Sequence, residues 1–222
     1  MSTPQPHASP RSLVLEQHLS PERLSTYVAA CSGRLDDALE LYAWNAAITG
    51  AFWEHLGYVE VLLRNTLDAR LTGRHAHLRR GGTWLDDPAR ELTDRARRDI
   101  VDARRRVRAK KKKPTHGQTV SELSFGFWRY LISKTYSGRF WPDLASGFPH
   151  APNRALTTIE RPVRELHDFR NRLGHHQRIW SEPLATRYRD LDVLARYIDP
   201  TVAVWVGGNS RVQATLLRHP WA

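Results

Sequence analysis

The chain has 222 residues, of which 41% are hydrophobic and 9% aromatic, a composition typical of a folded protein with one substantial core. Its single cysteine, Cys31, excludes an internal disulfide framework and a thiolate zinc cluster, and it favours a reducing compartment. No stretch approaches the roughly 20 apolar residues of a membrane span, and the N-terminal segment lacks the apolar region of a signal peptide. We therefore expect a soluble, cytoplasmic protein that is not embedded in a membrane.

Positive charge is the strongest compositional signal, with 34 Lys and Arg against 23 Asp and Glu and a net charge of +11. Residues 95–113 hold eleven basic residues and two aspartates. Such a block attracts polyanions through phosphate contacts and counterion release. A solvated helix face and an anionic lipid surface are the alternatives, and the thin apolar face of this segment disfavours the lipid. The predicted RNA-binding residues are Arg104, Arg105, Arg106, Arg108, Lys110, Lys111, Lys112 and Lys113.

A helical period of 3.6 residues dominates along the chain, strand alternation is almost absent, and the pattern predicts an all-α fold. We expect residues 1–18 to be disordered or extended and residues 19–222 to form a single domain. Ser20 and Pro21 resemble the cap and first residue of a helix that reaches about residue 30. A long helix is predicted over residues 36–71, with Gly73 as its stop signal. Its apolar stripe consists of Leu41, Trp44, Ile48, Phe52, Leu56, Val59, Leu63 and Leu67.

The chain after residue 86 predicts five more helices. One begins near residue 87 and carries the basic block, on an apolar spine of Leu92, Ala96, Ile100, Ala103 and Val107. The next runs from Thr119 or Ser121 to Gly138. A third spans residues 157–173, where Pro162 either kinks the helix or marks its true start. The last long helix follows Pro183 and ends before Pro200, and one short helix is expected after it.

A cluster of polar residues near the end of the helix over 157–173 is the first candidate for chemistry. Arg170 and His175 are five positions apart, which is roughly 140° around a regular helix, so they diverge if the helix stays regular. A left-handed conformation at Gly174 would end the helix and swing His175 back. From the residues alone, this pattern favours a structural cluster over an active site.

Residues 168–180, DFRNRLGHHQRIW, resemble the signature of the Abi-like (abortive infection) family within the HEPN superfamily. The motif of that superfamily is an arginine, a polar residue, a few further positions and a histidine, which match Arg170, Asn171 and His175. Two other segments resemble the family in the same order, LYAWN at 41–45 with VEVLLRN at 59–65, and LSFGFW at 123–128 with FP at 148–149. The resemblance covers residues 19–221, and Gln177 departs from it where many relatives have glutamate.

The resemblance implies a HEPN-like helical bundle with an inserted basic helix and loop and with C-terminal helices. It also implies a metal-independent endoribonuclease of a phage-defence or toxin–antitoxin system, which works as a homodimer and needs no cofactor. In such enzymes the 2′-hydroxyl of the RNA attacks the phosphate. His175 then acts as the acid or base and Arg170 holds the phosphate, with Asn171 and His176 in support. An antitoxin, either RNA or protein, is the further partner that the resemblance implies.

Three residues of the long helix are assigned a supporting role. Glu60 and Arg64 are four apart, which predicts an ion pair that anchors the helix beside the motif, and Asn65 is adjacent. No metal is expected, because no cysteine or carboxylate completes a ligand set with the histidines of the motif. Two alternatives to the nuclease stay open: a module that binds RNA or a nucleotide without cleaving it, and a helical dimerisation protein.

Overall fold

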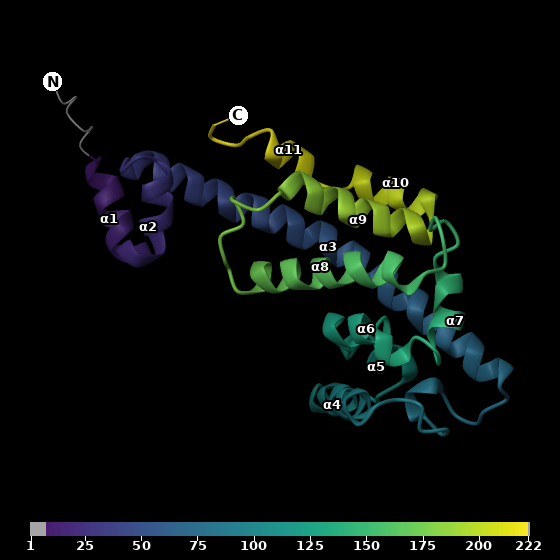
Figure 1. Cartoon of the computed structure of the whole chain (residues 1–222). Helices are drawn as coiled ribbons and strands as arrows, with labels where there is room; N and C mark the ends of the chain where they lie inside the picture. Colours follow the sequence, from purple (N-terminus) through teal and green to yellow (C-terminus); the bar gives the residue numbers. More distant parts are fainter. Residues whose placement is uncertain (1–7, 222) are drawn as a thin grey trace.

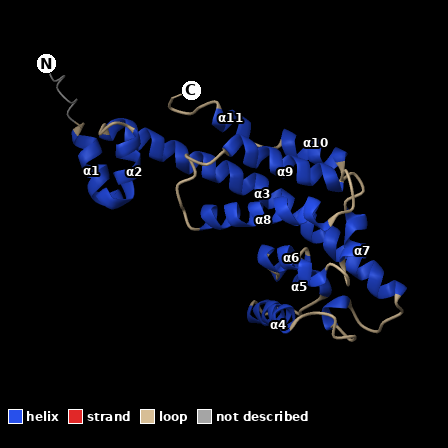
Figure 2. Cartoon of the chain, in the orientation of Figure 1, coloured by secondary structure: helices blue, strands red, loops and turns tan. Residues whose placement is uncertain are grey.

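The computed structural model describes residues 8–221, and over that range the chain is all-α, without a β-strand (Figure 2). This confirms the predicted fold class. Three short 3₁₀ helices, Trp84–Asp86, Lys134–Tyr136 and Ala145–Gly147, join the α-helices. The α-helices are α1 Pro10–Leu19, α2 Pro21–Ala30, α3 Leu35–His77, α4 Asp94–Ala109, α5 His116–Glu122, α6 Phe125–Leu131, α7 Trp141–Leu144, α8 Leu156–Gly174, α9 Leu184–Ile198, α10 Pro200–Gly208 and α11 Val212–Leu216.

Helix α3 is the spine of the molecule, and α2, α8, α9 and α11 pack along it (Figure 1). Its 43 residues extend over about 65 Å at the usual helical rise. The predicted stop at Gly73 is wrong, because the helix continues to His77. The last turn is held by tertiary contacts, since His75 is buried and its Nε2 lies 3.2 Å from the carbonyl oxygen of Gly81.

The N-terminal prediction is wrong for residues 10–18, which form helix α1 rather than an extended or disordered segment. Ser9 caps this helix by accepting a hydrogen bond from the backbone N–H of Ser12, and Pro10 occupies its first turn. The hydroxyl of Ser12 donates to Asp36 at the start of α3. This tertiary hydrogen bond fixes a segment whose own apolar pattern is weak. Residues 1–7 lie outside the described residues.

Two helix boundaries in the middle of the chain differ from the prediction. Helix α4 begins at Asp94 rather than near residue 87, because the carboxylate of Asp87 accepts hydrogen bonds from the backbone of Glu91 and Leu92 and holds a loop there. The predicted apolar spine of this helix is buried, as expected. The helix expected from residue 119 to 138 is interrupted, because Leu123 is extended and Ser124 caps α6 anew.

The remaining uncertainties of the second half are resolved by the structure. Pro162 lies inside α8 and does not mark its start. Helix α9 ends at Ile198, and the carboxylate of Asp199 then accepts from the backbone N–H groups of Thr201 and Val202. Asp199 therefore caps α10, so two short helices follow α9 where one was expected.

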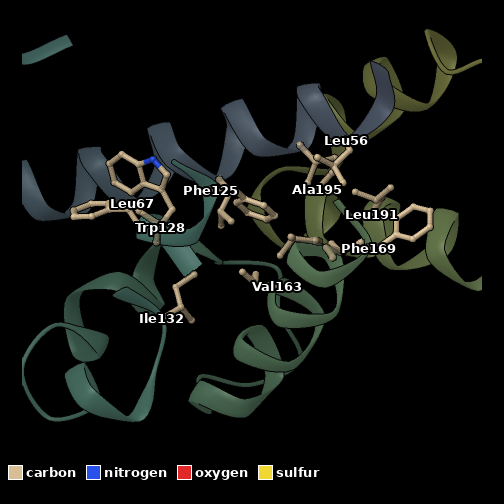
Figure 3. Packing of buried hydrophobic residues seen from close by; sticks show 14 of the residues in the cluster. Leu56, Leu67, Phe125, Trp128, Ile132, Val163, Phe169, Leu191 and Ala195 are labelled. Atoms are coloured by element: carbon tan, nitrogen blue, oxygen red, sulfur yellow. The ribbon is translucent and has the colours of Figure 1, made fainter. Parts of the chain in front are cut away.

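One connected cluster of buried side chains extends from Tyr27 to Val212 and joins the helices into a single core. Figure 3 shows part of it between α3, α6, α8 and α9. The labelled side chains that meet there are Leu56, Leu67, Phe125, Trp128, Ile132, Val163, Phe169, Leu191 and Ala195. Trp128, Phe125 and Phe127 are all buried in this core. In the range 8–221, no helix has the length and apolar character needed to cross a membrane.

His55 is a fully buried polar residue of α3, packed against α9. The centroid of its ring lies 5.1 Å from that of Tyr188. Neither ring nitrogen has a hydrogen-bond partner within the described part of the chain. Burial lowers the pKa of His55, and the carboxylates of Asp192 and Glu54 act against that shift.

Acid is expected to destabilise the fold through His55. Because the pKa of this group is lower in the folded than in the unfolded state, the unfolded chain takes up the proton first, and the free energy of unfolding falls below about pH 6.5. His55→Leu should remove this part of the decline, as measured by urea unfolding near pH 7.5 and pH 5.5. His77→Leu, at an exposed histidine, is the control and should retain the decline. A full wild-type decline in His55→Leu would show that another group is responsible.

Candidate functional site

The C-terminal end of α8 closes with a specific turn that presents two histidines. The backbone N–H of His176 donates to the carbonyl of Leu173 at 3.1 Å, and that of Gln177 donates to the carbonyl of Arg172 at 3.0 Å. Together these bonds form a Schellman motif, whose left-handed residue is His176 with a φ of 51°. The chain reversal expected at Gly174 therefore occurs two residues later, and Gly174 is the last residue of the helix.

A histidine in the left-handed region is less favourable than glycine, because its Cβ crowds the backbone. His176→Gly is therefore expected to raise the free energy of unfolding by about 0.5–1 kcal/mol, after allowing for the greater freedom of glycine in the unfolded chain. Urea unfolding checks this, with His175→Gly as the control, since His175 has a φ of −93° and gains no such relief. A loss of stability in His176→Gly would mean that the imidazole supports the fold.

His175 and His176 are both exposed and line a surface hollow of about 430 Å³, which we call the basic hollow. Every charged residue of its lining is an arginine. Its lining consists of Arg23, Thr26, Tyr27, Arg172, His175, His176, Gln177 and Arg178. Such a surface, without a carboxylate among its lining residues, is suited to bind an anion with several oxygens.

The three arginines of the basic hollow come from different elements and are held differently. Arg23, from α2, donates from Nε to the hydroxyl of Tyr42 at 2.9 Å and from Nη2 to the carbonyl of His176 at 3.2 Å. Arg172 is paired with Glu182 at 2.9 Å. For Arg178, no ion pair is found within residues 8–221. Arg23 thus attaches the turn after α8 to the N-terminal part of the molecule while adding its charge to the hollow.

Tyr27 is affected by the electrostatic field of the basic hollow. Burial is the largest influence on the pKa of its hydroxyl and raises it, and Tyr42 adds to the rise. Arg23 and Arg178 act in the opposite direction. The guanidinium groups of Arg23 and Arg178 therefore favour negative charge at the side of the basic hollow that Tyr27 lines.

Asn45 of α3 positions the loop that follows the histidines. Its side-chain Oδ1 accepts hydrogen bonds from the backbone N–H of Ile179 at 2.8 Å and of Trp180 at 3.1 Å. Asn45 is buried in the middle of the apolar stripe, where a polar residue is stable only with such partners. The loop after α8 is therefore fixed at one end by Asn45 and at the other by Arg23.

Arg170 lies outside the lining of the basic hollow. Its guanidinium carbon is 5.1 Å from the ring centroid of Trp53 on α3, and its Nε is buried with no hydrogen-bond partner in the described residues. Gly174 is close to both, because a Cβ built there would lie 3.6 Å from Trp53 and 3.8 Å from Nη1 of Arg170. Within one chain, the predicted pair is therefore divided, with Arg170 over Trp53 and His175 in the basic hollow.

Asn171 and His167 of α8 and Glu60 of α3 lie in the same region of the contact between these two helices as Arg170. Asn171 lies 3.5 Å from the His167 ring, Nδ2 to Nδ1, rather than in the basic hollow. Burial raises the pKa of Glu60, and Arg170 is the largest opposing influence, followed by Arg64 and His167. We call Trp53, Glu60, His167, Arg170 and Asn171 the α3–α8 cluster.

The predicted ion pair between Glu60 and Arg64 is not formed among the described residues. Arg64 instead donates from Nε to the side-chain oxygen of Asn65 at 3.3 Å. The partner with the greatest effect on the Glu60 carboxylate is Arg170 of α8, which lies far away in the sequence. Among the charged residues, Arg170 therefore influences the pKa of Glu60 more than Arg64 does.

The predicted RNA-binding block is partly engaged within the protein. Arg104 pairs with Asp86 at 2.6 Å, Arg105 pairs with Asp102 at 3.0 Å, and both Arg106 and Lys110 contact Glu122. In the part of the chain that the structure describes, the members without an ion pair are Arg108, Lys111, Lys112 and Lys113. Helices α5 and α6 lie between α4 and α8, so this block is a separate surface from the basic hollow (Figure 1).

Arg23, Asn45, Trp53 and His167 were not predicted as site residues. For Asn45, the signal in the sequence is a polar residue inside an apolar stripe. Over residues 8–221, no three His, Cys, Asp or Glu side chains gather in a way that could hold a metal ion. No family model, no curated protein and no solved structure matches the chain.

Proposed function

We propose that the protein is a metal-independent endoribonuclease whose active site is the basic hollow at the end of α8. The observation that carries the proposal is that His175 is exposed in an open hollow whose charged lining residues are all arginines. A guanidinium presents a fixed fork of donors to phosphate oxygens, and an imidazole exchanges protons near neutral pH. Both groups that transesterification of RNA requires therefore line the same hollow.

In the proposed reaction, the 2′-oxygen of the RNA forms a bond to the adjacent phosphorus while the bond from phosphorus to the 5′-oxygen breaks. One imidazole accepts the proton of the 2′-hydroxyl, and the other delivers a proton to the departing 5′-oxygen. We assign these transfers to His175 and His176. Arg23, Arg172 and Arg178 stabilise the charge that builds on the phosphate oxygens. The products are a 2′,3′-cyclic phosphate and a 5′-hydroxyl.

Arg170 is given a positioning role within one chain in this proposal, since its guanidinium lies over Trp53. Glu60, His167 and Asn171 support it from the same cluster. The exposed cations Arg108, Lys111, Lys112 and Lys113 provide a second surface for the phosphate backbone. The resemblance adds a homodimer, an antitoxin RNA or protein, and a phage-defence setting as further parts of the proposal.

Labelled RNA incubated with the pure protein in EDTA tests the proposal. We expect cleavage without a divalent ion and fragments that end in a 2′,3′-cyclic phosphate. Fragments that end in a 3′-hydroxyl, or cleavage only after a divalent ion is added, would contradict it.

A second candidate is a module that binds RNA without cleaving it, and the separation of Arg170 from the basic hollow favours this alternative. Both candidates predict that RNA binding weakens as salt rises, because phosphate contacts release counterions. Only the nuclease predicts fragments in EDTA. Binding with that salt dependence and without fragments would establish the binding module, and an absence of RNA binding would exclude both.

A further inference from the structure

Trp53 is a large aromatic residue on α3 that is unusually accessible, with 44% of its surface exposed. Arg170 lies over its ring, and Gly174 faces the edge formed by Cη2 and Cζ3. The ring is thus held between α3 and the end of α8 while much of it remains open to solvent. Exposed aromatic side chains beside cationic surfaces are the usual platforms on which single-stranded nucleic acids stack their bases.

Trp53 lines a second hollow of about 460 Å³, which we call the Trp53 hollow. Its remaining lining is small or apolar apart from Thr49 and His176. It consists of Ala46, Thr49, Gly50, Leu173, Gly174 and His176. A Cβ built at Gly50 meets nothing within 4 Å, so the floor beside Trp53 is open. An open, largely apolar space beside an indole ring suits a planar heteroaromatic ring.

His176 connects the two hollows, because it lines both the Trp53 hollow and the basic hollow. A smaller hollow of about 150 Å³ between Arg23 and Thr49 also has His176 in its wall. A cationic site for phosphate and an aromatic site for a ring therefore adjoin at one residue. In a nucleic acid, each base is attached to a sugar that is joined to a phosphate, so a base and a phosphate also lie next to each other.

We propose that the Trp53 hollow binds an unpaired nucleobase next to the phosphate in the basic hollow, so that the protein selects single-stranded RNA. This inference rests on the proposed function. A base within a duplex is stacked on both sides and cannot lie on Trp53, whereas an unpaired base is free to do so. Arg170 supports the indole as a cation–π partner, which gives the α3–α8 cluster a role in substrate selection.

The test uses a short single-stranded RNA that carries 2′-O-methyl groups, which cannot cleave itself, and a matched series in which one base at a time is removed while its sugar and phosphate stay. Affinities are measured by fluorescence anisotropy. Trp53→Ala is expected to weaken binding of the intact oligonucleotide by about 5- to 100-fold. It should change binding of the oligonucleotide that lacks the base at the Trp53 position much less. Trp53→Phe should retain part of the affinity, because phenylalanine keeps an aromatic face.

Trp205→Ala is the matched control, since Trp205 on α10 is also exposed, at 57%, and lines neither hollow. It should leave both affinities unchanged. If Trp53→Ala loses the same affinity for the intact oligonucleotide and for every oligonucleotide that lacks one base, the inference is overturned, while the proposed nuclease still stands. An absence of binding to any RNA by the wild-type protein would overturn both.

Discussion

Replacing His175 with alanine is expected to lower the rate of RNA cleavage by roughly 10²- to 10⁴-fold, the usual contribution of a positioned acid or base. The side chain is exposed at the helix end, and its backbone N–H donates to Asn171 regardless of the side chain. The variant should therefore keep its fold and its affinity for RNA. Rates with labelled RNA in EDTA, together with a binding curve, measure both quantities.

His77→Ala provides the control for that experiment. His77 is exposed in the last turn of α3, at the opposite end of that helix from the basic hollow (Figure 1). The His77→Ala variant should cleave RNA at the wild-type rate. If His175→Ala cleaves as fast as His77→Ala, His175 is not the proton carrier, and the assignment of the active site to the basic hollow fails.

Replacing Arg23 with alanine is expected to lower the rate of RNA cleavage by roughly 10- to 100-fold. Arg23 contributes a fork of donors to the hollow and also holds the turn through the carbonyl of His176. Arg23→Lys keeps the charge but loses the fork, so it should recover only part of the rate. The salt dependence of RNA binding should become shallower in Arg23→Ala, because one phosphate contact is lost.

Arg189→Ala is the control for Arg23, since Arg189 is an exposed arginine of α9 outside the lining of the basic hollow. It removes the same charge from the protein and should leave the rate unchanged. Equal losses in Arg23→Ala and Arg189→Ala would mean that total charge, and not the basic hollow, governs the reaction. Circular dichroism of each variant checks that the fold is intact.

The helices of this protein follow from local pattern, but several of their ends do not. The stripe from Leu41 to Leu67 is buried as its spacing predicted. Gly73 lies in the helix because the buried His75 stabilises the following turn, and α1 forms because Ser12 bonds to Asp36. The contact of His75 with Gly81 and the hydrogen bond of Ser12 to Asp36 each join residues that do not belong to the same helix, so the helical period could not predict them. A glycine or a short polar segment ends a helix only when no tertiary contact opposes it.

The candidate site was predicted only in part, because several of its contacts also join residues that are far apart in the sequence. The exposed His175 and His176 lie at a helix end, as the spacing and Gly174 suggested. Arg23 reaches His176 across 153 positions of sequence, and Asn45 reaches Ile179 across 134. Local periodicity contains no information on such pairs. The helical spacing of Arg170 from His175 already indicated that a regular helix separates them, and α8 stays regular through Gly174.

Chemical rescue tests whether His175 carries a proton in the reaction. His175→Gly opens space in the basic hollow, into which free imidazole can diffuse and replace the missing proton carrier. In EDTA, we expect this variant to cleave RNA slowly and to recover activity as imidazole is added, whereas Arg23→Ala should not respond. Wild-type activity in His175→Gly without imidazole, or a rate that stays low at every imidazole concentration, would contradict the role of His175 as a proton carrier.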